Sequence, residues 1–444
     1  MTQPFSFVPT THMDGEASYF PVTFDERLGL VLQMGFDPLP AWEPQIYLVT
    51  GRLSRDLLPD GTDTFRQRCI SGHAFDPHEA VDAAVGEALE RTFASYSHWE
   101  TAATGDRDFV NCPSIGLERI PRFSDTELIH LGNSYGQPDS RAVRSWYPAE
   151  SLATRLNVRV PAQLVFCPYH PPPSETLFWE PTTTGLAAGR GSEAAEVAGL
   201  LEVIERDALA VTWLLQLPGQ ELPLQAARKD AYPFVIHSLR RGSAEIRLAL
   251  VTIDIPVPVC VAAIYDDSSM PHVAFGSSAA LDVRTAAKKA LCEAAFTRYT
   301  LKLGIALFGE QCLDPFTDDP KTYQEHGLAW ARKESAARST WIFGKRSIPC
   351  FHPIDSGERQ NALLPRLVSM VSQAGYDVYR CDLSTPEIAS AGWSIRRIIV
   401  PGLQPLNPGR YRRMLQSARV EGTHHQLKRP GKGTSVNSAV HPFC

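Results

Sequence analysis

The stretch that decides the fold is GLAAGRGSEAAEVAGLLEVIERDALAVTW, residues 185–213. A glycine-rich turn opens it, and the remainder has the apolar spacing of one long helix. Ala198 projects to Glu202 at i+4 and to Glu205 at i+7, and the same face continues at Ala208. The pattern therefore places two carboxylates on the side of a helix that should face the core.

Two further segments repeat this arrangement weakly, at residues 79–96 and 283–299. Each reads as a helix in which a glutamate falls on a stripe of alanines. The aligned positions are Ala80 with Glu87, Ala83 with Glu90, and Ala286 and Ala290 with Glu293. Three such helices predict a cluster of five carboxylates at the core side of the fold.

A carboxylate cluster of this kind needs compensating cations. A single E-x-x-E-R stretch is usually a solvated helix face with local ion pairs, but an ionised carboxylate in a core is costly unless it is paired. Divalent metal is the simplest compensation, and Mg²⁺ prefers oxygen ligands and is often shared with nucleotide phosphates. Arg91 and Arg206 each follow a glutamate directly and could bind phosphate. The residues thus suggest a Mg–nucleotide site, with plain core helices as the alternative.

Composition sets the class of protein around this site. The chain has 444 residues, 43% hydrophobic residues and a formal charge of −6, so we expect a large core and no nucleic-acid-binding face. No apolar run is long enough to span a membrane, no secretory signal is present, and nine scattered cysteines show no C-x-x-C spacing. We therefore expect a cytoplasmic chain without a zinc site or a disulfide framework.

The rest of the chain reads as a mixture of strands and helices. Strand-like runs lie at residues 46–50, 163–167, 246–255, 272–277 and 394–400. The predicted fold class is α/β, of the α+β mixed kind, in a single large domain with mixed sheets. The KRPGKGTS segment at 428–435 lacks the first glycine of a P-loop, so we assign it to a flexible tail.

At the glutamate-bearing helices the chain resembles the YcaO family, and in particular the azoline-forming cyclodehydratases (D-protein type) of azole-containing peptide biosynthesis. The resemblance rests on SGHAFDPHEAVDAAVGEALER at 71–91, on the stretch at 185–213 and on VPGLQPL at 400–406. It implies a YcaO-type domain at 45–420, an N-terminal extension at 1–44, and a C-terminal tail at 421–444 that returns to the active site.

The resemblance also implies roles for individual residues. Five glutamates would hold Mg²⁺, namely Glu87, Glu90, Glu202, Glu205 and Glu293. The residues that would bind ATP are His73, Arg91, Arg206, Lys289 and Glu193. Here His73 stands where the family has a lysine, Lys289 replaces an arginine, and Ala194 takes the place of a glutamate beside Glu193. At the closing HPFC, Pro442 and the α-carboxylate of Cys444 would take part in catalysis.

The implied activity is ATP-dependent phosphorylation of backbone amide oxygens in a ribosomal precursor peptide, which converts Cys, Ser or Thr to azolines. Thioamide or amidine formation by the same activation, and a non-catalytic scaffold in a peptide-modifying complex, stay open as alternatives. The implied partners are the precursor peptide, a leader-binding E1-like or ThiF-like protein, a flavin dehydrogenase and a second copy in a homodimer. Such complexes make thiazole- and oxazole-modified bacteriocins and antibiotics.

Overall fold

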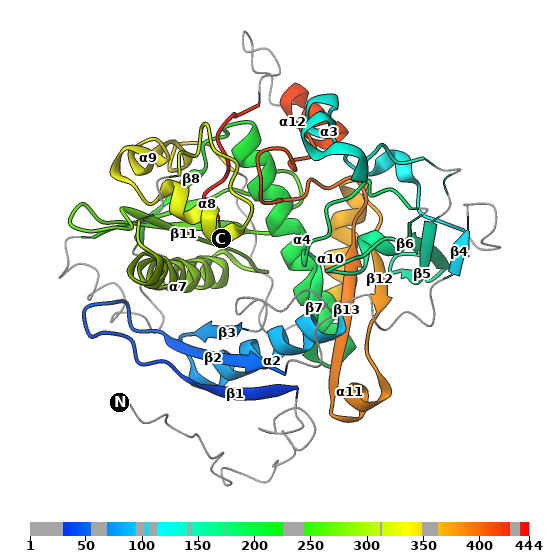
Figure 1. Ribbon diagram of the computed structural model, residues 1–444, viewed down its shortest axis with the longest axis horizontal. Helices are drawn as coiled ribbons and strands as arrows, with labels where there is room; N and C mark the ends of the chain where they lie inside the picture. The colour runs from blue at the N-terminus through cyan, green and yellow to red at the C-terminus, as the bar shows by residue number, and fades with distance from the viewer. Residues whose placement is uncertain are drawn as a thin grey trace.

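Three antiparallel sheets form the framework of the part of the chain that the computed structural model describes (Figure 1). The described residues are 30–54, 69–94, 103–105, 113–139, 142, 144–173, 175–224, 244–310, 313–348, 363–426 and 436–443. Sheets and helices are interleaved along the chain, which confirms the predicted mixed α/β class. Among the described helices, none is long and apolar enough to cross a membrane.

The first sheet has the order β1–β2–β3, with β1 at Val31–Phe36, β2 at Tyr47–Leu53 and β3 at Cys69–Ala74. Helix α2 (Pro77–Phe93) follows β3 and packs against it. Asp76 caps the helix by accepting hydrogen bonds from the backbone N–H groups of His78 and Glu79. Gly72 permits the contact, since a Cβ there would lie 2.1 Å from the Ala80 carbonyl oxygen.

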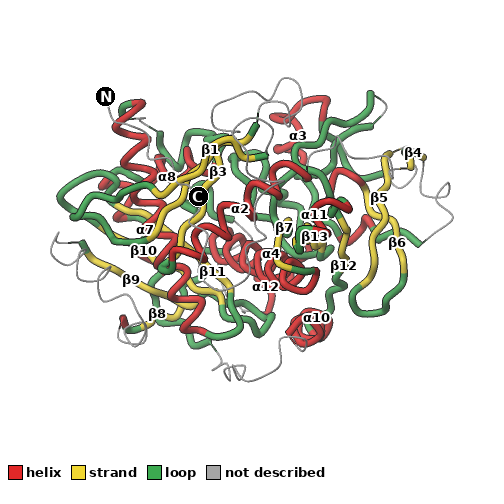
Figure 2. Tube along the Cα trace, turned by 90° about the horizontal axis from the view of Figure 1, so that it is seen from below, coloured by secondary structure: helices red, strands yellow, loops and turns green. Residues whose placement is uncertain are grey.

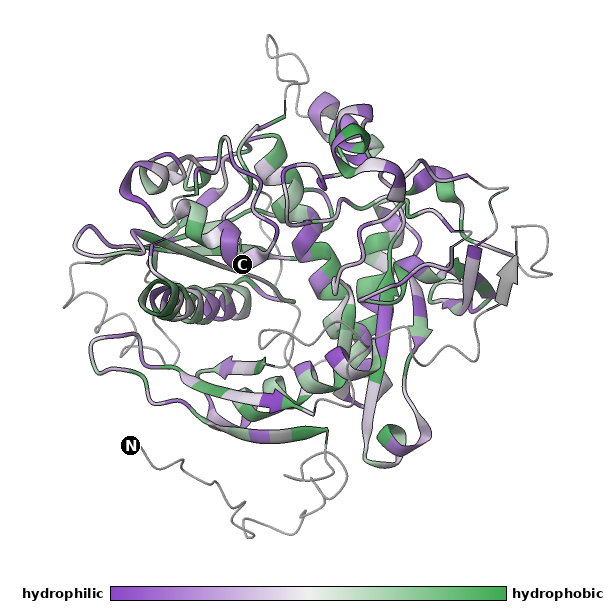
Figure 3. Ribbon diagram, in the orientation of Figure 1, coloured by the Kyte–Doolittle hydropathy of each residue, from purple (hydrophilic) through white to green (hydrophobic). Residues whose placement is uncertain are grey.

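The second sheet has the order β11–β10–β9–β8, from β8 (Gln220–Leu222), β9 (Glu245–Leu250), β10 (Val259–Tyr265) and β11 (Val273–Ala279). Helix α7 (Val283–Phe308) follows β11 and covers this sheet (Figure 1). The contact is again close at a glycine, because a Cβ on Gly276 would lie 2.1 Å from the backbone nitrogen of Ala294. The strands are mostly hydrophobic and α7 is striped (Figure 3), as expected for a helix that buries one face.

The third sheet has the order β4–β5–β12–β13–β7, with β6 paired to β5. Its strands are β4 (Ala103–Gly105), β5 (Arg144–Ser151), β6 (Asn157–Pro161), β7 (Leu186–Arg190), β12 (Tyr379–Asp382) and β13 (Trp393–Ile399). Helix α4 (Ser192–Leu214) follows β7 and packs on β7 and β13. The three sequence repeats are therefore three strand–helix units: β3–α2, β7–α4 and β11–α7.

Smaller helices surround this framework, and both views place α2 and α4 near the centre of the molecule (Figures 1 and 2). They are α3 (Asp125–Leu131), α8 (Tyr323–Trp330), α9 (Lys333–Ala337), α10 (Leu363–Gln373), α11 (Pro386–Ser390) and α12 (Ala418–Gln426). The boundary predicted at Glu421 falls inside α12, so the first residues of the proposed tail are helical. The division into 1–44, 45–420 and 421–444 stays a prediction.

The predicted strand at 163–167 is wrong. Residues Ala162–Leu164 form a 3-10 turn directly after β6. Gln163 is fully buried there, and its side-chain oxygen accepts hydrogen bonds from the backbone N–H groups of Phe178 (2.8 Å) and Trp179 (3.2 Å). The segment is thus held by a buried amide side chain, although its apolar composition resembles a strand.

Candidate active site

In each strand–helix unit a glutamate of the helix accepts a hydrogen bond from the backbone of the preceding strand or turn. The Ser71 N–H donates to Glu87 Oε2 at 2.5 Å, and the Ser277 N–H donates to Glu293 Oε2 at 2.7 Å. In the middle unit the Gly185 N–H donates to Glu202 Oε2 at 2.9 Å. The units thus position Glu87, Glu202 and Glu293 in the same way.

The other two glutamates connect neighbouring units. Glu90 of α2 accepts from the Ala188 N–H of β7 at 2.8 Å. Glu205 of α4 accepts from the Ser277 hydroxyl at 2.6 Å and from the Ala279 N–H at 3.0 Å, both on β11. The five predicted carboxylates are therefore brought into one region between the three helices.

The electrostatics of this region show that the carboxylates are desolvated and repel one another. Burial, together with the charges of Glu202 and Glu87, raises the pKa of Glu90 to about 8. Burial and the neighbouring Glu205 raise the pKa of Glu293 to about 8 as well, and burial raises the pKa of Glu202. Without a cation the cluster cannot be fully ionised at neutral pH.

Two arginines accompany the carboxylates. Arg91 donates through Nε (2.9 Å) and Nη2 (2.7 Å) to Glu87 Oε1. Arg206 lies 3.8 Å from Glu202 through its Nε, and its guanidinium carbon is 5.2 Å from the centre of the Tyr323 ring. The Arg206 Nε is buried and makes no hydrogen bond within the described residues. A phosphate oxygen is the acceptor that such a donor lacks.

The donor set fits a metal-bound nucleotide. Carboxylate oxygens are the ligands that Mg²⁺ prefers, and the surplus of negative charge is what divalent cations would compensate. Within the described residues, no three His, Cys, Asp or Glu side chains already lie at the spacing of a metal site. Each of the five glutamates accepts a backbone N–H through one carboxylate oxygen, and these glutamates are the residues that would hold Mg²⁺.

The remaining predicted nucleotide-binding residues are placed differently. The His73 ring is stacked on Phe296, with 4.2 Å between the ring centres, and burial lowers its pKa to about 4. His73 is therefore neutral at pH 7. Lys289 is exposed on α7. Glu193, in the first turn of α4, has a buried Oε1 without a hydrogen-bond partner among the described residues.

The C-terminal residues lie in the core close to this region. Trp213 and Trp330 donate their indole N–H groups to the carbonyl oxygens of Ala439 and Val440, each at 2.9 Å. Pro442 is buried, and burial, His326 and the positive Arg206 lower the pKa of His441. Cys444, the other predicted catalytic residue, lies outside the described residues.

Sequence reasoning missed several residues of this region. Asp207, in the ERDA stretch, points away from the glutamates: it accepts from the Gln404 N–H at 2.8 Å and pairs with Arg419 at 2.6 Å. It thereby fixes the VPGLQPL segment and α12 against α4. Tyr323, under Arg206, had no motif to reveal it, but Arg397 could have been found as a charge within the apolar run of β13.

Residues 71–404 match the family model described as "YcaO cyclodehydratase, ATP-ad Mg2+-binding". The chain belongs to the YcaO family. As a YcaO domain it binds ATP and Mg²⁺, which accounts for the uncompensated carboxylates. The family likeness predicted from the sequence is confirmed.

The chain is also similar to individual proteins. An uncharacterized protein of Methanothermobacter thermautotrophicus is 33% identical over 168 residues, which are 37% of this chain and 44% of that protein. Two solved structures share the fold. A heterocyclase in complex with substrate and cofactor has a TM-score of 0.73 at 19% identity, over 94% of this chain and 55% of the other.

The second is YcaO from Methanopyrus kandleri bound with AMPPCP and Mg²⁺, with a TM-score of 0.55 at 21% identity, over 84% and 86% of the two chains. The matched part is about half the length of the Methanothermobacter thermautotrophicus protein and of the heterocyclase chain.

Proposed function

We propose that the chain is an ATP-dependent cyclodehydratase that phosphorylates backbone amide oxygens of a ribosomal precursor peptide and converts Cys, Ser or Thr to azolines. The observation that carries the proposal is the cluster of five backbone-anchored glutamates beside Arg91 and Arg206 in a YcaO fold. Membership of the YcaO family supports the less specific statement that the chain is a peptide-modifying enzyme.

The proposed division of labour follows from the positions of the side chains. When bound, Mg–ATP supplies the phosphoryl group and neutralises the charge that develops on the reacting oxygens. Glu87, Glu90, Glu202, Glu205 and Glu293 would hold the metal ions. Arg206 would donate its free Nε–H to a phosphate oxygen. Arg91, which is held by Glu87, would also donate to the phosphates. His73, Lys289 and Glu193 are proposed as peripheral nucleotide contacts.

The C-terminus is proposed to act on the peptide. Phe443 packs between Trp213 and Phe275, with ring centres 6.2 and 5.8 Å from its own, and is the last described residue of the chain. Burial lowers the pKa of His441 and the charge of Arg206 lowers it further, so His441 lies near the proposed site. We assign Pro442 to holding the end in place and the Cys444 α-carboxylate to proton removal as a general base.

A non-catalytic scaffold is the second candidate, and His73 favours it. A neutral imidazole stacked on Phe296 attracts phosphate less than the lysine of the family pattern. The five glutamates favour catalysis instead, since buried carboxylates without a ligand destabilise the fold. Thioamide or amidine formation would use the same activated amide and a different nucleophile.

The proposed partners are the precursor peptide, a leader-binding E1-like or ThiF-like protein, a flavin dehydrogenase and a second copy of the chain. The deciding experiment incubates the protein with the peptide, its leader-binding partner and Mg–ATP, and follows the loss of one water per ring by mass spectrometry. Azoline formation that requires ATP supports the proposal. Nucleotide binding without any peptide modification would favour the scaffold.

A further inference from the structure

Arg397 is a buried charge without a counter-ion. It lies on β13 and is 2% exposed, and its Nε donates to the Leu164 carbonyl oxygen at 3.0 Å. Among the described residues, its Nη1 finds no hydrogen-bond partner and no carboxylate forms an ion pair with it. The preceding residue, Arg396, differs, since it pairs with Glu196 and with Asp382.

The electrostatic consequence is that the guanidinium is not compensated. Burial lowers the pKa of Arg397, and the neighbouring Cys167, Glu202 and Cys381 oppose that effect only in part. Removing an arginine from water is costly unless an anion accompanies it. An anion that is not part of the described chain would supply what is missing.

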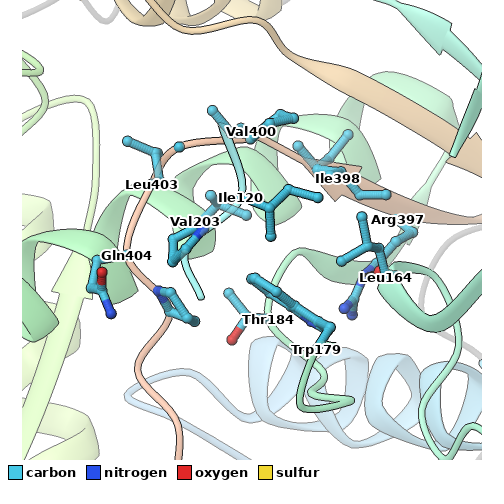
Figure 4. Close-up of a pocket in the computed structure, with 15 residues that line it drawn as sticks. Ile120, Leu164, Trp179, Thr184, Val203, Arg397, Ile398, Val400, Leu403 and Gln404 are labelled. Atoms are coloured by element: carbon cyan, nitrogen blue, oxygen red, sulfur yellow. Dashed lines mark hydrogen bonds between the residues drawn. The ribbon is translucent and has the colours of Figure 1, made fainter. Parts of the chain in front are cut away.

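Arg397 lines a pocket that could hold such an anion (Figure 4). The pocket encloses about 50 Å³, and a single water needs roughly 10–15 Å³ on this measure. Trp179 also lines it, with an indole Nε1 that is buried and makes no hydrogen bond among the described residues. The other walls are largely apolar, from Ile120, Leu164, Val203 and Leu403.

The two donors are held in the same neighbourhood by the buried turn at Gln163. Leu164 accepts from the Arg397 side chain, and Gln163 accepts from the Trp179 backbone. Thr184 lines the pocket as well, directly before Gly185, whose N–H binds Glu202. The pocket is therefore adjacent to the glutamate site.

From these observations we infer that the pocket of Arg397 and Trp179 binds a small oxyanion. Two N–H donors, one of them charged, in an apolar enclosure select a negatively charged oxygen acceptor of a few atoms. Inorganic phosphate and a carboxylate share this chemistry. Phosphate as a reaction product rests on the proposed function, whereas binding of a carboxylate does not.

The test is a titration of the full chain with sodium phosphate, sodium acetate and sodium chloride at matched ionic strength, followed by thermal unfolding. It is run with and without saturating Mg²⁺ and AMPPCP, a non-hydrolysable ATP analogue, so that phosphate does not compete for the nucleotide site. We expect a saturable rise in Tm with phosphate or acetate over chloride. Arg397→Met should abolish the rise, and Arg397→Lys should restore part of it.

Trp179→Phe provides a milder variant, because it removes one donor and keeps an aromatic side chain. It should weaken the apparent affinity by up to about tenfold. Matched controls are Arg155→Met and Trp42→Phe, whose side chains are exposed and do not line the pocket. If Arg397→Met does not fold, Trp179→Phe against Trp42→Phe still decides the question.

The outcomes separate the sources of the anion. A response to phosphate alone assigns the pocket to phosphate, and a response to acetate assigns it to a carboxylate. The inference is overturned if neither anion raises the Tm of the wild type saturably over chloride. It is also overturned if Arg397→Met and Trp179→Phe respond to the anions as the wild type does. If AMPPCP does not stabilise the protein, that result counts against the ATP-dependent function only, since binding to the pocket is measured by the anion titration.

Discussion

Oε1 of Glu87 accepts from Arg91, and through the other carboxylate oxygen Glu87, like Glu202, accepts a backbone N–H. Glutamine can still accept that bond through its amide oxygen. We expect Glu87→Gln and Glu202→Gln to lower the rate of ATP hydrolysis about 100-fold or more, because each removes a proposed metal ligand. Glu245→Gln, at an exposed position, is the control. Wild-type hydrolysis in both variants would refute the site assignment.

The raised pKa values of Glu90 and Glu293 predict a pH dependence. Both groups have a pKa of about 8 in the folded protein and a reference value of 4.5, so the folded state holds protons that the unfolded state releases. The stability of the metal-free protein should therefore fall as the pH rises from about 4.5 to about 8. Mg²⁺ competes with these protons, so its stabilising effect should grow over the same interval.

Thermal unfolding with and without Mg²⁺ and AMPPCP, at several pH values, measures this difference. Glu90→Gln should flatten the pH dependence, since it removes one of the two titrating groups. A shift in Tm that stays constant or shrinks toward high pH would show that the carboxylates do not bind the metal.

His73 offers a test of how the nucleotide is held. The ring is neutral at pH 7 and stacked on Phe296. If it contacts phosphate, His73→Lys should keep or improve the apparent affinity for ATP, because an ammonium attracts phosphate more strongly. His73→Ala should weaken it. The same ATP dependence in wild type and both variants would place His73 outside the site.

At the residue scale, the spacing of apolar residues showed which glutamates share a helix face. It could not show how far around the helix the buried face extends. Ala80, Ala286 and Ala290 are buried as predicted. Ala83 and Ala198 are exposed, so the stripe interpretation is wrong at these two positions. Helical spacing fixes directions around an axis, whereas the neighbouring elements decide where burial ends.

At the scale of elements, each strand–helix unit depends on close approach between its two parts. A Cβ at Gly276 would lie 2.1 Å from the Ala294 backbone nitrogen, so Gly276→Ala must push α7 away from β11. We expect a loss of about 1–3 kcal/mol in the free energy of unfolding, measured by urea titration. The matched control is Gly35→Ala, where nothing lies within 4 Å of the added Cβ. Equal stability of the two variants would contradict tight packing in this unit.

The helices could be predicted well because their signals are local. The predicted spans 79–96, 193–213 and 283–299 correspond to α2, α4 and α7, with α7 running further, to Phe308. The pairing of β13 with β7 could not be predicted, since the two strands lie far apart in the sequence. The repeat indicated three helices, and tertiary contacts decided how they meet.

At the scale of the whole molecule, the described C-terminal residues complete the core, and Cys444 is proposed to act at the site. Deleting Cys444 alone keeps the described contacts of Ala439, Val440 and Phe443 and shifts the terminal carboxylate by one residue. We expect AMPPCP to stabilise this variant as it does the wild type, while azoline formation falls sharply. Cys444→Ala keeps the carboxylate and should stay active.

Mass spectrometry of the peptide product reads out both variants. Equal azoline yield from the deletion and the full chain would remove the terminus from the mechanism. Loss of activity in Cys444→Ala would instead make the thiol the acting group.

The anchoring of the five glutamates has a consequence for how long a ligand stays bound. The backbone donors belong to β3, to β7 and the turn before it, and to β11, that is, to all three sheets. Local opening of any one sheet would misplace at least one carboxylate, because proteins open in cooperative pieces of unequal stability. The residence time of a ligand at this centre would then be limited by whichever sheet opens most often.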